Sequence, residues 1–267
     1  MTTTTILGDV VGAIVGDAAT VTVLLPLGAD PHDYQASALQ VAEMRSADLV
    51  VANGLHLEAG LDDILDTLAA DGARVYRVAE HLNPLPFGDS GGDLDPHVWL
   101  DPLRMAEAAR QIAVELEAVA PGIDWAARAD AYGAALLQTD AEIRTILDVV
   151  PADRRKLVTS HDAFGYFAAR YGFEVIGTVV PGASTLAEPS SAALAGLLAT
   201  IDAEGISAIF VGTTESAILA ETLAAETGGA VEVVGLFTGS LGAAGSGAET
   251  LIDMLLTNAE RIAGALS

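Results

Sequence analysis

The sequence contains no cysteine, and basic residues are scarce in it. Lys156 is the single lysine among 267 residues, and 12 Lys and Arg stand against 37 Asp and Glu. Without thiols the chain can form neither disulfides nor zinc–thiolate sites, and it has no cysteine nucleophile. The formal net charge of −25 leaves no basic surface for the phosphates of nucleic acid, so we expect no nucleic-acid partner. An anionic membrane surface is disfavoured for the same reason.

Long apolar runs are also missing. No stretch approaches the roughly 20 apolar residues that cross a bilayer, so we expect no membrane-spanning segment. The first residues carry no basic charge of a signal peptide, and the chain begins at the edge of its first apolar element. We therefore expect that a leader precedes this chain in its precursor.

The 51% hydrophobic content is enough for the cores of one large or two ordinary domains.

Strand-like and helix-like patterns alternate through most of the chain. Short apolar runs predict strands, and the amphipathic stretches between them predict helices. Residues 3–16 are predicted to form a short strand and a helix. Further strands are predicted at 19–27, 47–53, 73–78, 156–159, 174–180, 208–212 and 231–237, and helices at 31–45, 57–68, 163–171, 190–204, 215–227 and 248–266. Such alternation is typical of parallel sheets covered by helices.

Residues 102–150 follow a different pattern. They are rich in Ala, Glu, Leu and Arg and are interrupted only near Pro121 and Gly122, which predicts two helices. The second helix, at 125–149, is longer than the average of about 11–12 residues. We therefore expect an α/β fold of two lobes, each with a mostly parallel sheet flanked by helices, joined by a long rigid connector helix. The expected boundaries are 1–122 for the N-terminal lobe, 123–150 for the connector and 151–267 for the C-terminal lobe.

One histidine lies in an unusually constrained stretch of sequence. His97 is enclosed by Pro96 and Pro102, which restrict the backbone and remove two amide donors. Asp95 and Asp101 are close enough in the chain to orient its imidazole ring. This arrangement indicates a functional site.

Two further histidines have similar neighbours. His32 belongs to the run Gly-Ala-Asp-Pro-His-Asp-Tyr and His161 to the run Val-Thr-Ser-His-Asp-Ala-Phe, each following an apolar run. Ligands bind beyond the carboxyl ends of parallel strands, so we expect His32, His97 and His161 to meet in a cleft between the lobes. Three imidazoles suit a divalent ion such as zinc. His56 and His81 lack this context, and a packed or solvated ring is expected at each.

Two roles are compatible with the three aspartates near these motifs. Asp33, Asp101 and Asp162 either accept a hydrogen bond from an imidazole and fix its tautomer, or cap helices.

Two classes of function are compatible with three imidazoles. One is a receptor that captures a metal ion for transport, and the other is a zinc hydrolase with an open position for water. A hydrolase needs a general base above that water, and no residue in the three motifs stands out as one. We therefore expect no enzyme. An adhesin role is compatible with the receptor but would depend on surfaces that the sequence does not reveal.

Five motifs in this chain resemble those of a known family. The chain is similar to the zinc- and manganese-binding solute-binding proteins of ABC transporters in the runs at 28–34, 47–58, 95–102, 160–167 and 236–242. The resemblance covers nearly the whole chain. It implies two α/β lobes with a long backbone helix, a metal held between them, and delivery of the ion to an ABC permease membrane subunit. It also implies a monomer outside the cytoplasm, at the periplasm or cell surface, with a signal peptide and often a lipid anchor in the precursor.

The resemblance also assigns ligands. It implies that His32, His97 and His161 hold the metal, and histidine at the third position favours zinc over manganese. Where the family commonly has a carboxylate as fourth ligand, this chain has Gly239. Water, an anion, Glu215 or another carboxylate is expected to take that place.

Overall fold

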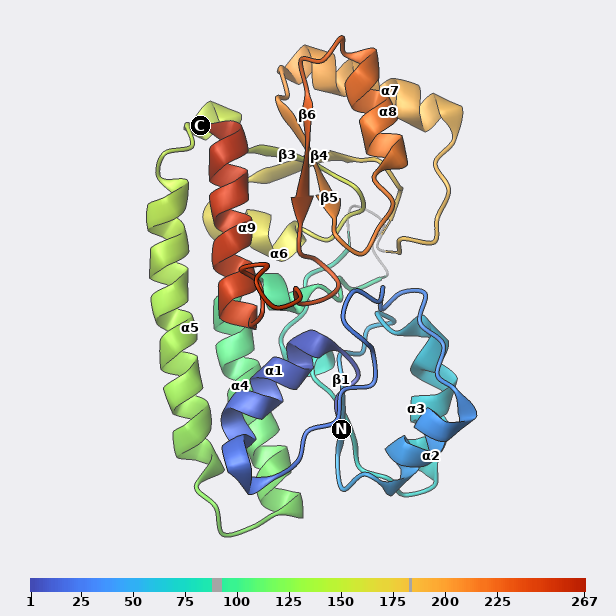
Figure 1. Cartoon of the computed structure of the whole chain (residues 1–267), viewed down its shortest axis with the longest axis vertical. Helices are drawn as coiled ribbons and strands as arrows, with labels where there is room; N and C mark the ends of the chain where they lie inside the picture. Colours follow the sequence, from blue (N-terminus) through green and yellow to red (C-terminus); the bar gives the residue numbers. More distant parts are fainter. Residues whose placement is uncertain (88–92, 183) are drawn as a thin grey trace.

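The computed structural model describes residues 1–87, 93–182 and 184–267. It forms two α/β lobes, and helix α5 runs along both of them (Figure 1). The helices are α1 (Thr5–Val15), α2 (Ala38–Ser46), α3 (Asp62–Ala70), α4 (Pro102–Val119), α5 (Trp125–Leu147), α6 (Gly165–Tyr171), α7 (Ser191–Glu204), α8 (Ile218–Glu226) and α9 (Leu251–Leu266). The strands are β1 (Val50–Ala52), β2 (Val75–Arg77), β3 (Lys156–Thr159), β4 (Glu174–Thr178), β5 (Ala208–Gly212) and β6 (Glu232–Leu236). The expected fold class is confirmed.

The sheet of the N-terminal lobe is small. Strands β1 and β2 pair in parallel, and Thr2 extends the sheet through parallel bridges to Val51 and Val23. The prediction of a strand at 19–27 is therefore wrong, because Val23 alone in this segment forms a β-bridge within the described residues. The segment lies at the sheet edge, and Pro26 has no amide hydrogen with which to continue the pairing.

Helix α2 begins seven residues later than its pattern predicts. Its start is fixed by Ser37, whose hydroxyl accepts a hydrogen bond from the backbone N–H of Gln40, while the Gln40 side chain accepts one from the Ser37 N–H. This reciprocal cap defines a helix start. His32 therefore lies in an irregular turn between Leu25 and Ser37 rather than in the first turn of a helix.

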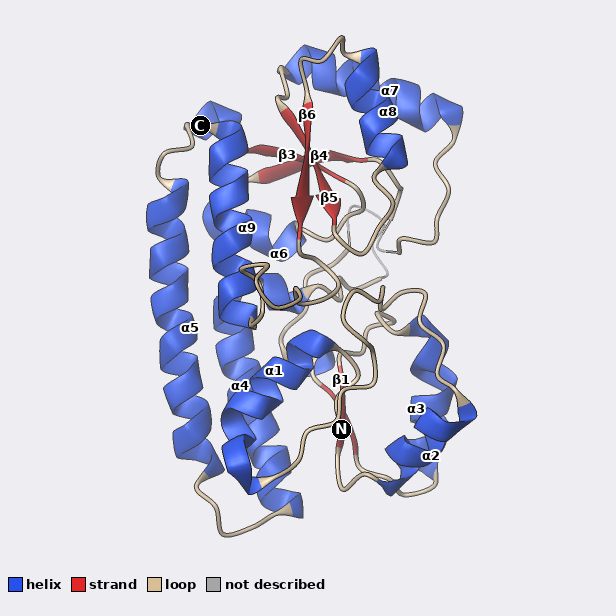
Figure 2. Cartoon of the chain, viewed as in Figure 1, coloured by secondary structure: helices blue, strands red, loops and turns tan. Residues whose placement is uncertain are grey.

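The C-terminal lobe contains a four-stranded parallel sheet in the order β4-β3-β5-β6. The bounds predicted for β3 and β5 are confirmed residue for residue. Both strands are central and almost wholly buried, and their apolar residues, Leu157 and Val158 in β3 and the whole of β5, indicate a strand clearly. Figure 2 shows helices on both faces of this sheet. Because β3 is central, its carboxyl end delivers His161 to the middle of the molecule.

One continuous apolar core joins the two lobes. It includes Ile14 of α1, Ile112 of α4, Leu136 of α5, Met254 of α9 and Phe210 of β5. Helix α5 thus packs on elements from both lobes and does not cross between them as an isolated rod. A shared, close-packed core resists relative movement of the parts that it joins.

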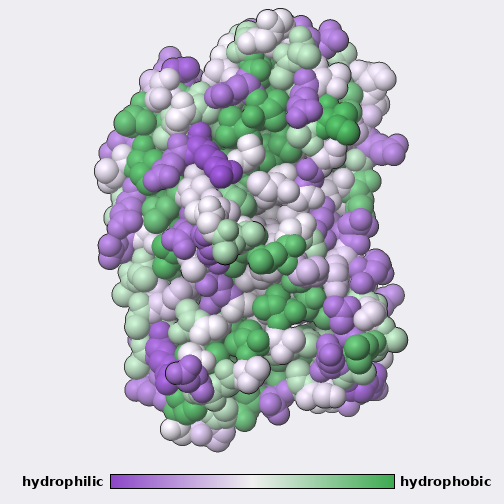
Figure 3. Space-filling model, in the orientation of Figure 1, coloured by the Kyte–Doolittle hydropathy of each residue, from purple (hydrophilic) through white to green (hydrophobic). Residues whose placement is uncertain are grey.

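One face of the molecule can be compared for polar and apolar residues. On the face drawn in Figure 3, hydrophobic residues are interspersed with hydrophilic ones. No helix within the described ranges is both long and apolar enough to cross a membrane.

Candidate metal centre

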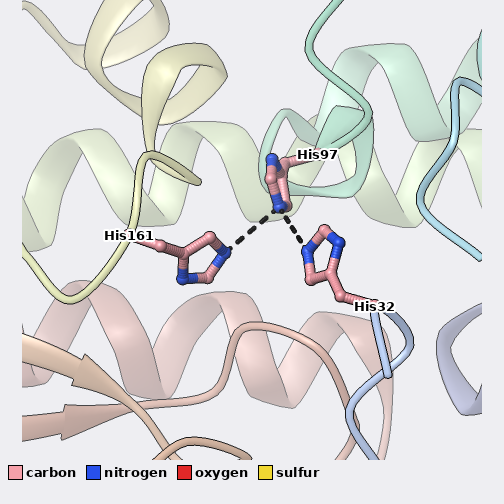
Figure 4. A group of neighbouring side chains, drawn as sticks. All are labelled: His32, His97 and His161. Carbon is pink, nitrogen blue, oxygen red and sulfur yellow. Dashed lines mark hydrogen bonds between the residues drawn. The ribbon is translucent and has the colours of Figure 1, made fainter. Parts of the chain in front are cut away.

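Three imidazoles from separate segments meet between the lobes. The Nε2 atom of His97 lies 3.4 Å from Nε2 of His32 and 3.3 Å from Nε2 of His161. All three side chains are buried, and one ring nitrogen of each lies within 4.8 Å of the others. Figure 4 shows that the second nitrogen of each ring points away from the group. The structure thus brings together the three histidines that the sequence singled out.

A buried aspartate fixes the ring of His97. Asp95 Oδ1 accepts hydrogen bonds from the backbone N–H of His97, at 2.9 Å, and from its Nδ1, at 2.8 Å. The Nδ1–H tautomer that this requires leaves the Nε2 lone pair facing the other two rings. Trp99 packs edge-on against His97, with ring centroids 5.3 Å apart, and donates its indole N–H to the backbone oxygen of Thr238. Burial raises the pKa of Asp95 to about 7.

The other aspartates do not act on the imidazoles in this way. Asp101 caps α4 by accepting a hydrogen bond from the Leu103 N–H, and it forms an ion pair with Arg170. Asp33 is exposed. Within the described ranges, neither Asp33 nor Asp162 has a hydrogen bond to an imidazole. Of the two roles left open by the sequence, capping holds for Asp101, whereas Asp95 orients His97.

A glutamate lies behind the ring of His161. Glu215 Oε1 is 3.0 Å from His161 Nδ1, and the two side chains are 7% and 4% exposed. Burial alone would raise the pKa of Glu215, but His161, Ser160 and His32 together outweigh it and lower that pKa. The carboxylate faces the nitrogen opposite to the one that faces His32 and His97. Glu215 is therefore not placed as a fourth ligand.

Gly239 lies where a side chain would have little room. A Cβ atom there would approach Pro31 Cδ to 2.8 Å and Thr214 Oγ1 to 3.1 Å. Pro31 directly precedes His32, so this close approach fixes the turn that carries the first imidazole. Among the described residues, no carboxylate joins the group of three imidazole nitrogens.

His32 is held differently from the other two histidines. Its backbone N–H donates to Asp30 Oδ1 at 3.0 Å, and Asp30 Oδ2 accepts from Thr185 of the C-terminal lobe at 2.6 Å. Its ring forms no hydrogen bond or ion pair with a carboxylate of the described residues. It also lines a cavity of about 560 Å³, whose wall includes Asp62, Asp66, Glu80, Asp93, His56 and Arg77. Acidic side chains outnumber basic ones in this wall, which favours the approach of a cation to His32.

Burial keeps at least two of the rings uncharged. Burial, with smaller contributions from the neighbouring imidazoles, lowers the pKa of His32 to about 2, and it lowers the pKa of His97 well below 6.5. A divalent ion requires deprotonated ligands, and uncharged imidazoles with converging ring nitrogens meet this requirement.

The low pKa of His32 predicts a specific pH dependence of stability. The pKa in the unfolded chain is about 6.5, so unfolding takes up a proton at any pH between about 2 and 6.5. The contribution of His32 to the free energy of unfolding of the metal-free protein therefore falls as the pH drops below 6.5, whereas Asp95, with its raised pKa, contributes in the opposite direction. In His32→Gln the loss should be smaller by about 1.4 kcal/mol per pH unit. Urea unfolding with a chelator at pH 7, 6 and 5 measures both slopes, and equal slopes would contradict a buried, uncharged His32.

The fold and this group define a class of protein. Two α/β lobes on a long helix, with three inward-facing imidazoles at their junction, form a binding protein for a small cation. The chain belongs to the family described as ZnuA, zinc-uptake complex component A periplasmic, whose model matches residues 1–265. This is a family of solute-binding receptors.

Individual relatives agree with this assignment. The manganese-binding lipoprotein MntA of Halalkalibacterium halodurans is 30% identical over 271 residues, covering all of this chain and 88% of its own length. The zinc-binding protein TroA of Treponema pallidum is 34% identical over 252 residues, covering 91% of this chain and 80% of its own length. Its solved structure matches with a TM-score of 0.91 over all of this chain and 98% of that chain, at 33% identity. The metal ABC transporter substrate-binding lipoprotein FimA of Streptococcus parasanguinis is 27% identical over 276 residues, covering all of this chain and 88% of its own length.

Proposed function

We propose that this protein captures a divalent metal ion outside the cytoplasm and delivers it to the permease of an ABC transporter. His32, His97 and His161 hold the ion through their Nε2 atoms. The single observation that carries this proposal is the convergence of these three buried nitrogens within 4.8 Å of one another. The names of the relatives, among them a metal ABC transporter substrate-binding lipoprotein, support the delivery step and an extracytoplasmic, lipid-anchored location.

Zinc is the ion that this donor set fits best. Zinc readily takes imidazole nitrogens in a tetrahedral arrangement, whereas manganese favours carboxylate, carbonyl and water oxygens. A relative named for manganese and a relative named for zinc have similar sequence identity to this chain, at 30% and 34%. Overall sequence similarity therefore does not decide between the two ions. Water or a small anion takes the fourth coordination position, since Gly239 has no side-chain ligand atom and Glu215 faces the opposite side of His161.

The lobes move little during capture. We take 1–122 and 151–267 as the two lobes and 123–150 as their connector. The continuous core around α5 supports this proposal, because a wide hinge motion would have to open close-packed apolar surface.

Catalysis is not part of this function. A zinc hydrolase needs a carboxylate or imidazole free to take a proton from the metal-bound water. The carboxylates nearest to the rings, Asp95 and Glu215, each lie against an Nδ1 atom instead.

Metal competition on untagged protein tests the proposal. The chain should bind one zinc ion, retain it against an excess of manganese, and release no product from activated esters or peptides. Tighter binding of manganese would overturn the choice of ion. Zinc-dependent hydrolysis that is lost in His97→Ala would overturn the receptor function itself.

A further inference from the structure

A tight turn at the end of β5 brings a carboxylate back over the strand. The backbone N–H of Glu215 donates to the carbonyl oxygen of Gly212 at 3.0 Å, which closes the turn. The N–H of Gly212 donates at 3.2 Å to the hydroxyl of Ser160, the residue before His161. The turn is thereby tied to the segment that carries the third imidazole.

Gly212 makes room for that carboxylate. A Cβ atom at this position would overlap both Glu215 Oε1 and Thr238 Oγ1. Any side chain here would thus displace the Glu215 carboxylate from its place beside His161. The glycine has no positive φ, so the space that it leaves free, and not its backbone conformation, explains its presence.

The carboxylate has one evident target. Glu215 Oε1 and His161 Nδ1 are both buried and 3.0 Å apart, and within the described part of the chain this contact is the one that faces them, although the two atoms are not aligned for a hydrogen bond in this rotamer. A neutral imidazole carries one N–H. A carboxylate at Nδ1 retains the proton there, and the lone pair of Nε2 is then free for a metal ion.

We propose that Glu215 is a positioning residue for metal capture, which holds His161 in the metal-binding tautomer and orientation, and that Gly212 is required to admit it. Asp95 also lies at the Nδ1 atom of a histidine, His97, and there the contact is a hydrogen bond of 2.8 Å. Glu215 also places a negative charge beside a site in which Gly239 provides none. This inference rests on the proposed metal-binding function.

Four variants test the pair. Glu215→Ala and Glu215→Gln should each lower zinc affinity by about 10- to 100-fold, the range typical of residues that orient metal ligands. Gly212→Ala should lower it comparably, since its Cβ displaces the carboxylate. In Gly212→Ala/Glu215→Ala most of the loss should be shared with Glu215→Ala, because both changes remove the carboxylate from His161, and any remainder measures the overlap of the new Cβ with Thr238 Oγ1. Glu221→Ala, an exposed glutamate on α8 of the same lobe, is the charge-matched control and should leave affinity unchanged.

A tautomer measurement separates positioning from general damage. In metal-free wild type, ¹⁵N shifts of the His161 ring should show the proton on Nδ1, and Glu215→Ala should move population to the Nε2–H form. The tautomer measurement tests the role of Glu215 even if Gly212→Ala fails to fold. Unchanged zinc affinity and an unchanged tautomer in Glu215→Ala would overturn the role of Glu215. Failure of the wild type to bind zinc would instead reject the proposed function.

Discussion

Alanine in place of His97 is expected to lower the affinity for zinc by more than about a hundredfold. His97 is the central imidazole, with its Nε2 within 3.4 Å of the corresponding atoms of both His32 and His161. Loss of a residue that merely orients a metal ligand costs about 10- to 100-fold, and loss of the ligand itself should cost more. Competition titration against a zinc chelator of known affinity measures the change.

Two further variants make this result interpretable. His97→Ala leaves the buried Asp95 without its imidazole partner, which can lower stability, so His32→Ala is the parallel test; its ring contacts no carboxylate of the described residues. His56→Ala is the control, because its ring is exposed and pairs with Asp62. Wild-type affinity in His97→Ala and His32→Ala would reject the three-imidazole site, as would a large loss in His56→Ala alone.

Zinc should stabilise the folded protein strongly. A ligand that binds only the native state at about 1,000 times its Kd adds about 4 kcal/mol to the free energy of unfolding. For a chain of this size that corresponds to a rise in Tm of roughly 8–16 °C. The ion should act on both lobes together, since His32 and His161 come from different lobes and the two lobes share one apolar core. Thermal unfolding with free zinc and with chelator measures the shift.

The same variants provide the controls for stabilisation. His56→Ala should keep the full shift, whereas His97→Ala should lose nearly all of it. An equal zinc-dependent rise in Tm in wild type and His97→Ala would show that zinc stabilises the protein from some other place.

Much of the histidine group could be predicted, because His97 and His161 are constrained by residues next to them in the sequence. Asp95 and Pro96 orient and restrain His97 from within three consecutive residues. The central strand β3 is short and β-branched at its end, and its buried residues directly precede Ser160, so its carboxyl end, and with it His161, could be located in advance. Such signals need no knowledge of distant contacts.

Features that depend on distant contacts could not be located in this way. The turn around His32 is set by Pro31 against Gly239 and by Asp30 against Thr185, pairs more than 150 residues apart. The position of Glu215 depends on the space above Gly212, which no periodic pattern reveals. The late start of α2 is different, because the Ser37 cap is local and its sequence signature could have been read.

The most direct test of the central claim is the position of the ion itself. Crystals grown with zinc should show one strong anomalous peak at the zinc absorption edge, at about 2.0–2.1 Å from Nε2 of His32, His97 and His161. Glu215 should remain at Nδ1 of His161, outside the coordination sphere. A zinc ion bound at another place, for example by His56 and Asp62, would contradict the account. An ion coordinated by Glu215 would contradict it as well.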